Sequence, residues 1–91
     1  MLGSRGVAYI AVIHISGAVE AKLATRHNVT AAEVREACVL TRLERAVWHE
    51  GDRARRLLAT GTTGDGRRLN VVLYPADERN GTWWLGTAMW A

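Results

Sequence analysis

The sequence predicts an α+β domain, in which a small antiparallel β-sheet of four to five strands carries two N-terminal helices packed on one face. Three observations predict this class. A capping box at Thr30 and Glu33 begins a helical apolar pattern, the apolar period changes to two residues after Arg45, and a Gly-Asp-Gly turn at residues 64–66 joins two strand-like runs. The expected order is strand, helix, helix and then three or four strands, which favours helices gathered on one side of the sheet.

The length and composition of the chain limit the classes of protein to which it can belong. The 91 residues form one expected domain, residues 1–91, and 48% of them are apolar, which suffices for a single core. Cys38 is the only cysteine, so an internal disulfide is excluded, and we expect its thiol on the buried face of a helix. The apolar run at residues 7–15 is too short to span a bilayer and lacks a signal-peptide cleavage pattern. We therefore expect a cytoplasmic protein with no membrane partner.

The first strand and the two helices are predicted from local signals. Residues 7–15 are rich in β-branched side chains and predict a strand that joins the sheet, while residues 18–27 predict a short helix. Asn28 suits the left-handed conformation that ends a helix. In the capping box, the Thr30 hydroxyl accepts from the Glu33 amide and the Glu33 carboxylate reaches back. The positions that follow at helical spacing are Val34, Ala37, Cys38 and Thr41, with Leu40 and Leu43 nearby.

Strands are expected in the second half, at residues 46–50, 55–62, 67–74 and 83–90. Turns at residues 51–52 and 64–66 and a polar loop at residues 75–81 separate them. Side chains alternate across a strand, so Trp83 and Trp84 should point to opposite faces, one toward the core and one toward the uncovered face.

Arginine dominates the basic residues of this chain. The formal net charge is +3, and eleven of the twelve basic residues are Arg, whose planar guanidinium suits phosphate or carboxylate. From residue 45 to residue 68, six arginines face three acidic residues. A solvated surface explains this excess about as well as an anion site does.

The hairpin expected around residues 64–66 carries an arginine pair on each strand. Each pair sends one guanidinium to either face, so one of Arg55 and Arg56 should share a face with one of Arg67 and Arg68. With the helices on one side, we expect these cations to converge on the uncovered face, where they suit a polyanion.

Two motifs carry a resemblance to a known family. Residues 22–34 read Lys-Leu-x-x-x-His-Asn-Val-Thr-x-x-Glu-Val, and residues 61–72 read Gly-Thr-Thr-x-x-Gly-Arg-x-Leu-x-Val-Val. From about residue 20 to residue 88, the chain resembles the BrnT-type toxins, which belong to the RelE-like group of bacterial toxin–antitoxin ribonucleases. The resemblance implies a RelE-like fold, metal-independent cleavage of RNA and neutralisation by a cognate antitoxin protein.

The last strand departs from the family pattern. Family members commonly carry an Ala-Arg pair there, and that Arg is thought to sit in the RNA cleft. Here residues 87–90 read Thr-Ala-Met-Trp, so Met89 stands at the Arg position. This departure puts catalysis in question and leaves binding without cleavage as the alternative.

Metal-free RNA cleavage needs a base for the ribose 2′-hydroxyl, an acid for the leaving oxygen and cations for the developing phosphorane charge. The candidates for proton transfer are His14, His27, His49, Glu50 and Tyr74. We favour His49, which precedes the arginine hairpin, with Arg56 and Arg68 as phosphate partners.

Other residues are expected to play a smaller or a structural part. His27 matches the family motif and is a catalytic candidate, although a histidine near a helix end more often has a structural role. Lys22 and Arg26 on the first helix, with Arg55 and Arg67 on the hairpin, are expected to add a basic rim that binds nucleic acid.

The remaining signals concern partners and cofactors. Four tryptophans could stack on RNA bases or pack against protein, and we favour the core and a protein partner. A non-catalytic binding module and a homodimer are the alternatives to a ribonuclease, and a toxin–antitoxin hetero-oligomer is expected if the family reading holds. No metal-ligand spacing appears, and the glycines of residues 61–66 lie in a hairpin, so we expect neither a metal nor a cofactor.

Overall fold

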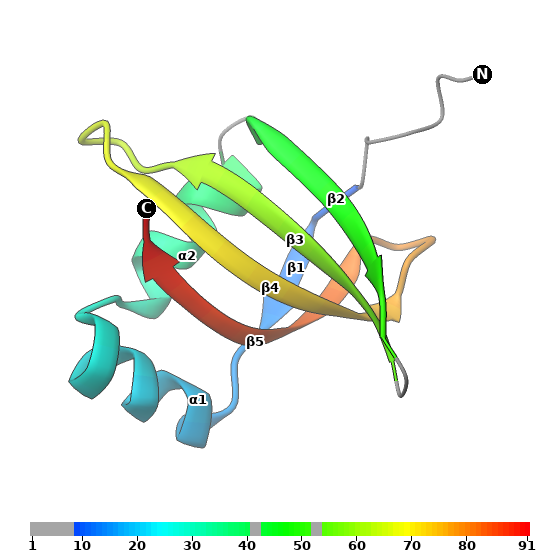
Figure 1. Ribbon diagram of the computed structural model, residues 1–91, viewed down its shortest axis with the longest axis horizontal. Coiled ribbons are helices and arrows are strands. Elements are labelled where there is room, and N and C mark those ends of the chain that lie inside the picture. The colour runs from blue at the N-terminus through cyan, green and yellow to red at the C-terminus, as the bar shows by residue number, and fades with distance from the viewer. Residues whose placement is uncertain (1–8, 41–42, 52–53) are drawn as a thin grey trace.

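A computed structural model describes residues 9–40, 43–51 and 54–91, although the side chain of Leu40 lies outside this description. Within that part of the chain, a five-stranded sheet carries a helical layer on one side (Figure 1). The elements are β1 (Val12–His14), α1 (Gly17–Lys22), η1 (Leu23–His27), α2 (Ala31–Arg35), η2 (Glu36–Leu40), β2 (Arg45–Glu50), β3 (Arg55–Thr62), β4 (Arg68–Asp77) and β5 (Thr82–Trp90). The α+β class and the element order are confirmed, with four strands after the helices.

The sheet is mixed, so the prediction of a purely antiparallel sheet is wrong. The strand order is β1-β5-β4-β3-β2, and β1 runs parallel to β5 while all other pairs are antiparallel. The helices separate β1 from the meander, and β5 lies between β1 and β4. This pairing places Ile13 opposite Trp83, and both side chains are buried. Burial of this pair at the sheet edge accounts for the parallel register.

The first strand is shorter than predicted. Only Val12–His14 is extended and paired, whereas the apolar run covers residues 7–15, of which residues 7 and 8 lie outside the described part. The amides of Ala11 and Val12 both donate to the carbonyl of Gly81, at 2.8 and 2.9 Å. These bonds fix the residues just before β1 against the loop that precedes β5. The paired strand is therefore shorter than the apolar run that predicted it.

Both helices begin at side-chain caps and end in wider π-helical turns. Ser16 caps α1, and its Oγ accepts from the Val19 amide at 3.2 Å. The capping box is confirmed, since Thr30 Oγ1 accepts from the Glu33 amide at 3.1 Å and Glu33 Oε1 accepts from the Thr30 amide at 2.9 Å. Asn28 adopts the left-handed conformation expected of it, with φ of 54°. Short local signals thus define where each helix begins and ends.

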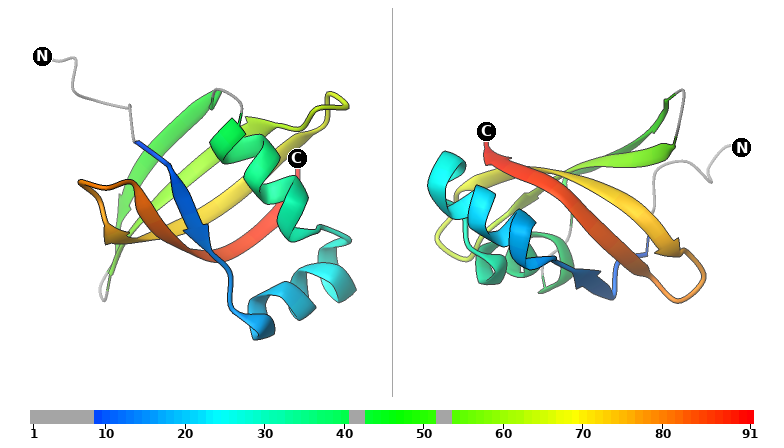
Figure 2. Two further views of the ribbon diagram at one scale, coloured as in Figure 1. Left: turned by 180° about the vertical axis from the view of Figure 1, so that it is seen from behind. Right: turned by 90° about the horizontal axis from the view of Figure 1, so that it is seen from below.

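The core lies between the sheet and the helical layer, as Figure 2 shows from behind and from below. Its buried apolar residues are Ile10, Ile13, Leu23, Val29, Val34, Ala37, Cys38, Leu57, Ala59, Leu69, Val71, Leu73, Trp83, Leu85 and Ala88. At Gly61 the helix η2 contacts β3 directly, because an added Cβ would lie 2.1 Å from the carbonyl oxygen of Ala37. A glycine is therefore required where the helix crosses the strand.

The hairpin between β3 and β4 forms where predicted, but with a longer turn. Its loop closes through the Thr63 amide, which donates to the Arg67 carbonyl at 2.9 Å, and only Gly66 has positive φ, at 88°. An Asp-Gly turn of the two-residue type would need positive φ at Asp65 as well, and Asp65 does not adopt it. Asp65 instead accepts from the Thr63 hydroxyl, and this bond lowers the pKa of its carboxyl. The loop of five residues, 63–67, does not need two consecutive residues with positive φ, as a two-residue type I′ turn does.

The second hairpin also differs from the expected loop. β4 continues through Pro75 to Asp77, so the polar loop predicted at residues 75–81 shrinks to residues 78–81. A register shift lies between Pro75 and Asp77, where the missing amide of proline costs the ladder little. In the described part of the chain, none of the helices has the length and apolarity needed to cross a bilayer.

Candidate functional site

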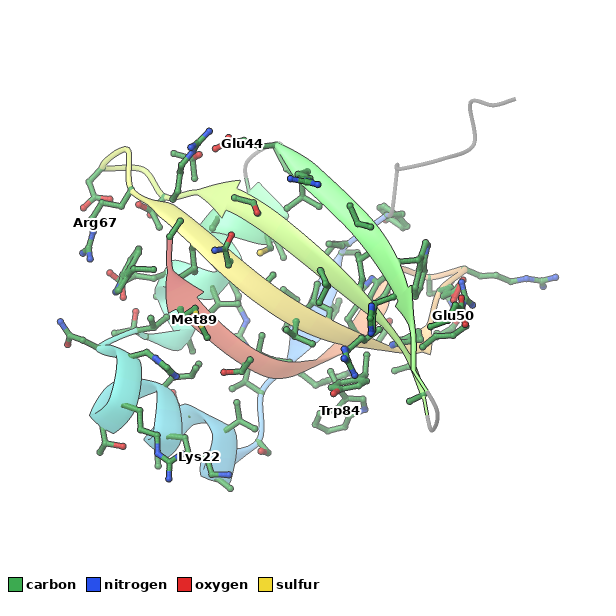
Figure 3. All side chains as sticks on the ribbon, viewed as in Figure 1. Lys22, Glu44, Glu50, Arg67, Trp84 and Met89 are labelled. Atoms are coloured by element: carbon green, nitrogen blue, oxygen red, sulfur yellow. The ribbon has the colours of Figure 1, made fainter. Side chains whose placement is uncertain are left out.

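One face of the sheet carries no helix, and we call it the open face. Figure 1 looks onto it, with α2 behind the sheet. Trp83 and Trp84 lie on opposite faces as predicted, because Trp83 is 1% exposed in the core and Trp84 is 48% exposed. Figure 3, in the same view, shows Trp84 and Met89 along β5. The open face is the surface of the sheet that is available to a ligand.

A groove of about 410 Å³ crosses the open face. Its lining residues are Arg45, Val47, Leu58, Ala59, Thr60, Asn70, Val71, Val72, Thr87 and Met89. Val47, Leu58 and Met89 are 44%, 39% and 44% exposed, so the middle of the groove is apolar. The predicted face lined by arginines is thus wrong for its centre, where β-branched and aliphatic residues occupy the outward positions of the strands.

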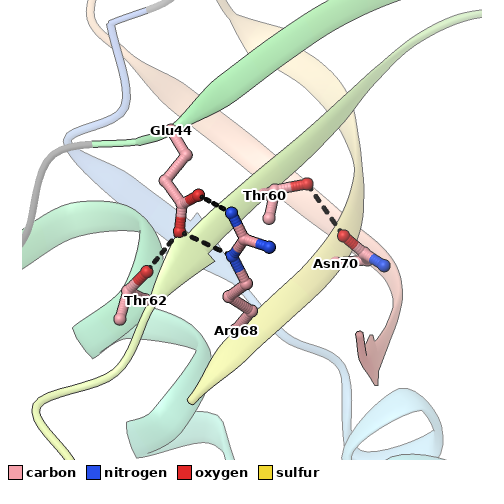
Figure 4. A network of polar contacts seen from close by, with 5 residues as sticks. All are labelled: Glu44, Thr60, Thr62, Arg68 and Asn70. Atoms are coloured by element: carbon pink, nitrogen blue, oxygen red, sulfur yellow. Dashed lines mark hydrogen bonds and ion pairs between the residues drawn. The ribbon is translucent and has the colours of Figure 1, made fainter. Parts of the chain in front are cut away.

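A closed polar network bounds the groove at one end (Figure 4). Glu44 accepts from Arg68 Nη2 at 2.8 Å and from Arg68 Nε at 3.3 Å, and it also accepts from the Thr62 hydroxyl. The hydrogen bond from Arg68 and then that from Thr62 lower the pKa of the Glu44 carboxyl. Arg68 therefore shares its guanidinium with a neighbouring carboxylate, although the pair is exposed.

A line of ring-bearing and basic side chains crosses the open face at the other end. The strand register pairs His14 with Trp84, Trp84 with Tyr74, and Arg56 with His49, and continuing the β3–β4 register by one residue beyond Leu57 and Leu73 puts Tyr74 next to Arg56. We call this line the cross-strand row, and it consists of His14, Trp84, Tyr74, Arg56 and His49. Neighbouring members of such a row have Cβ atoms about 5 Å apart.

Contacts within the cross-strand row fix its aromatic part. The rings of His14 and Trp84 lie 4.9 Å apart, centre to centre. The Tyr74 ring covers Gly86, where an added Cβ would lie 2.6 Å from Tyr74 Cε2. Because Gly86 has no side chain, the Tyr74 ring can pack directly over the backbone of β5 at this position.

The four hairpin arginines divide between the faces as predicted. Arg56 and Arg68 occupy outward positions on the open face, and Arg55 and Arg67 occupy the alternate positions. The two open-face arginines do not converge, however. Arg68 pairs with Thr62, six residues along β3 from Arg56, which corresponds to about 20 Å. The expectation of one shared anion site is therefore wrong, and Arg56 belongs to a different end of the face from Arg68.

Arg55 and Arg67 are held by neighbours on the helix-covered side. Arg55 forms ion pairs with Glu50 and Glu78, each at 3.1 Å, and its guanidinium lies 4.0 Å from the centre of the Trp48 ring. Arg67 lies 3.5 Å from the centre of the Trp90 ring. Arg56 differs from both, because within the described residues its guanidinium has neither an ion pair with a carboxylate nor an aromatic ring beneath it.

Three predicted site residues lie in the helical layer. Lys22 ends α1, Arg26 lies in η1 and His27 ends η1, so none of them belongs to a strand of the open face. Lys22 projects from α1 in Figure 3. The structure therefore brings His49 and Arg56 together and leaves His27, Lys22 and Arg26 apart from them.

Sequence reasoning underrated three members of the cross-strand row. His14 was one of several candidates for proton transfer, and it is exposed beside Trp84. Tyr74 and Trp84 were considered without any link to His49. Only the pairing register reveals that link, and a single sequence carries no direct signal for the register of distant strands.

Two further chemistries find no support in the described residues. Burial raises the pKa of the Cys38 thiol to about 12, which keeps it protonated near neutral pH. No group of three or more His, Cys, Asp or Glu side chains in the described part could hold a metal ion. Comparison of the chain with family models, curated proteins and solved structures gave no match.

Proposed function

We propose that this protein binds RNA on its open face and cleaves it without a metal, with the reacting phosphate beside Arg56. The observation that carries this proposal is the cross-strand row, in which Arg56 lies between His49 and Tyr74. Arg56 is half-buried and has no carboxylate partner in the described residues, so its charge is available to a phosphate.

The proposed reaction is an in-line displacement at phosphorus. The ribose 2′-oxygen attacks the adjacent phosphorus as its proton leaves, the bond to the 5′-oxygen breaks, and a 2′,3′-cyclic phosphate and a 5′-hydroxyl result. The base and the acid must lie on opposite sides of the phosphorus. This requirement is supported by the strand order, because His49 lies on β2 on one side of Arg56 and Tyr74 lies on β4 on the other.

Each of the three side chains suits one role. The neutral imidazole of His49 can accept the 2′-proton on its unprotonated ring nitrogen. The phenolic hydroxyl of Tyr74 is a hydrogen-bond donor and can donate to the 5′-oxygen. Arg56 donates to the non-bridging oxygens, whose charge grows in the transition state.

The biological role that we propose follows from the two family motifs in residues 22–34 and 61–72. The activity would be that of a cytoplasmic toxin of a type II toxin–antitoxin system, held inactive by an antitoxin that covers the open face. Expression alone should then arrest growth, and Arg56→Ala should relieve the arrest. Finding a neighbouring reading frame that encodes a small DNA-binding protein would support this role.

The direct test is incubation of the purified protein with RNA in excess EDTA. Cleavage products should end in a 2′,3′-cyclic phosphate, and His49→Ala and Arg56→Ala should each lower the rate roughly 10²- to 10³-fold. Arg79→Ala is the matched control, because Arg79 is an exposed arginine in the loop before β5. Cleavage that requires added metal, or that survives both substitutions, contradicts the proposal.

A second function is favoured by one observation. Met89 lines the groove, at the position where the resembling family carries an arginine. This observation supports a binding module that holds RNA or an acidic protein without cutting it. Salt-sensitive RNA binding with intact RNA after long incubation would identify this function. A tight dimer that is indifferent to RNA would instead identify a homodimeric interaction domain.

A further inference from the structure

Trp84 differs from the other tryptophans of this chain in its surroundings. The Trp83 ring is buried and packs 5.6 Å from Trp48, which Arg55 covers, and Arg67 covers Trp90. Trp84 alone among the four is exposed, and its ring contacts the ring of His14. A large flat ring is thus held in position on the open face while nearly half of its surface meets solvent.

Trp84 also lies at a specific distance from the proposed phosphate site. Two strand spacings separate it from Arg56, which corresponds to about 10 Å, and Tyr74 fills the position between them. This distance is comparable to the reach of one nucleotide from its phosphate to its base. A nucleotide whose phosphate contacts Arg56 can therefore place its base over Trp84.

We propose that Trp84 is the platform on which an unpaired RNA base stacks, so that the substrate class is single-stranded RNA. This inference rests on the proposed RNA-binding function and extends it from the backbone to the base. Stacking needs a free base face, which a duplex does not offer. The site tolerates every base and favours purines, whose larger rings cover more of the indole.

The charges on the open face argue against a second copy of this chain as the occupant. The open-face groups near Trp84 include His14, Arg56 and His49. Of the carboxylates on this face, Asp77 lies opposite Thr82 at the end of β4 and accepts from the Asn80 side chain, and Glu44 is paired with Arg68 at the far end. Two such faces would bring like charges together. An anionic ligand with flat apolar parts fits both features, and single-stranded RNA has both.

The test compares binding of an adenine-rich RNA strand with binding of an abasic strand of the same length, by fluorescence anisotropy at fixed salt. For the base-bearing strand, Trp84→Ala should weaken binding roughly 5- to 150-fold, as expected for one lost stack. Trp84→Phe should retain most of the affinity, because it keeps a ring. For the abasic strand, wild type and Trp84→Ala should bind alike.

Two controls separate stacking from other causes. Tyr9→Ala removes an exposed aromatic ring outside the cross-strand row and should leave binding unchanged. The salt dependence of binding should be the same for Trp84→Ala and wild type, whereas Arg56→Ala should reduce its slope by about 0.7, since one phosphate contact is lost. Melting temperatures of the variants report any loss of fold.

The outcomes distinguish this inference from the proposed function. If Trp84→Ala binds base-bearing RNA like wild type while Arg56→Ala binds it weakly, the stacking platform is overturned and RNA binding stands. If wild type binds neither strand, both proposals fail. Equal affinity of wild type for both strands and for polyglutamate also overturns the platform, because the face then recognises charge alone.

Discussion

The two faces of the sheet use neighbouring residues of the same type in opposite ways. Arg55 lies against Trp48 with two carboxylate partners on the covered side, whereas the open-face neighbour Arg56 lies in the cross-strand row beside His49. Trp83 is part of the core, and Trp84 is exposed. On the covered face these groups contribute to stability, and on the open face their contacts are left for a ligand.

This contrast shows that the number of arginines in a segment does not indicate how many of them can bind a ligand. The excess of arginine over residues 45–68 suggested one cationic surface, yet in the described part of the chain only Arg45 and Arg56 lie on the open face without a carboxylate partner, and they lie apart, Arg45 opposite Thr60 and Arg56 opposite His49. Arg67 covers Trp90 and Arg68 pairs with Glu44. An arginine-rich segment is therefore a weak indicator of an anion site until the partners of each guanidinium are known.

The largest expected effect is a difference in stability between alanine variants of the two adjacent tryptophans. Trp83→Ala should lower the free energy of unfolding by about 3–5 kcal/mol, because it leaves a large cavity in the core. Trp84→Ala should change it by less than about 1 kcal/mol, because that side chain is half exposed. Chemical denaturation monitored by circular dichroism measures both. Similar losses for the two variants would contradict the assignment of faces.

A second comparison concerns two glycines in the covered layer. Gly61→Ala should cost about 1–3 kcal/mol, because its Cβ would press on the Ala37 carbonyl. Gly17→Ala, at the start of α1, has nothing within 4 Å of the added Cβ and should leave stability unchanged or slightly higher. Thermal melting separates them, and a harmless Gly61→Ala would mean that η2 does not contact β3 so closely.

The paired arginines of β3 give a third comparison, in binding. Arg56→Ala should weaken binding to single-stranded RNA and reduce its salt slope by about 0.7, while Arg55→Ala should leave that slope unchanged. The reason is that Arg55 faces Glu50 and Glu78 on the covered side. RNA-binding titrations at several salt concentrations measure both slopes. Equal effects of the two substitutions would contradict the assignment of RNA binding to the open face alone.

The smallest expected effect is a pH dependence at the closed end of the groove. The pKa of Glu44 is lowered in the folded state, so its contribution to stability is complete above the ordinary value of 4.5 and is lost as pH falls through the lower folded value. Because the pair is exposed, the change should be small. In Glu44→Gln this part of the acid dependence should disappear from denaturation curves recorded between about pH 5 and pH 2.

Local features of the fold were predictable because they depend on a few adjacent residues. The capping box of Thr30 and Glu33, the left-handed Asn28 and the hairpin closed near Gly66 all follow from backbone geometry and short-range hydrogen bonds. The bounds of β3 and the opposite faces of Trp83 and Trp84 follow from strand periodicity.

The parallel position of β1, the ion pairs of the arginines and the composition of the cross-strand row could not be predicted in the same way. Each depends on which distant strands pair and in which register, as His14 with Trp84 shows across 70 positions of sequence. Register is decided by the joint burial of side chains from several elements, and no local segment contains that information.

The amino-acid sequence by itself determined the α+β class, the ends of the helices and the alternation that sends each arginine and tryptophan to one face or the other. These properties arise from short-range sterics, capping and periodicity. The tertiary structure alone decided that Arg68 is paired and that His49, Arg56, Tyr74, Trp84 and His14 form one line. That line exists because packing of the shared core fixes five strands in a single register.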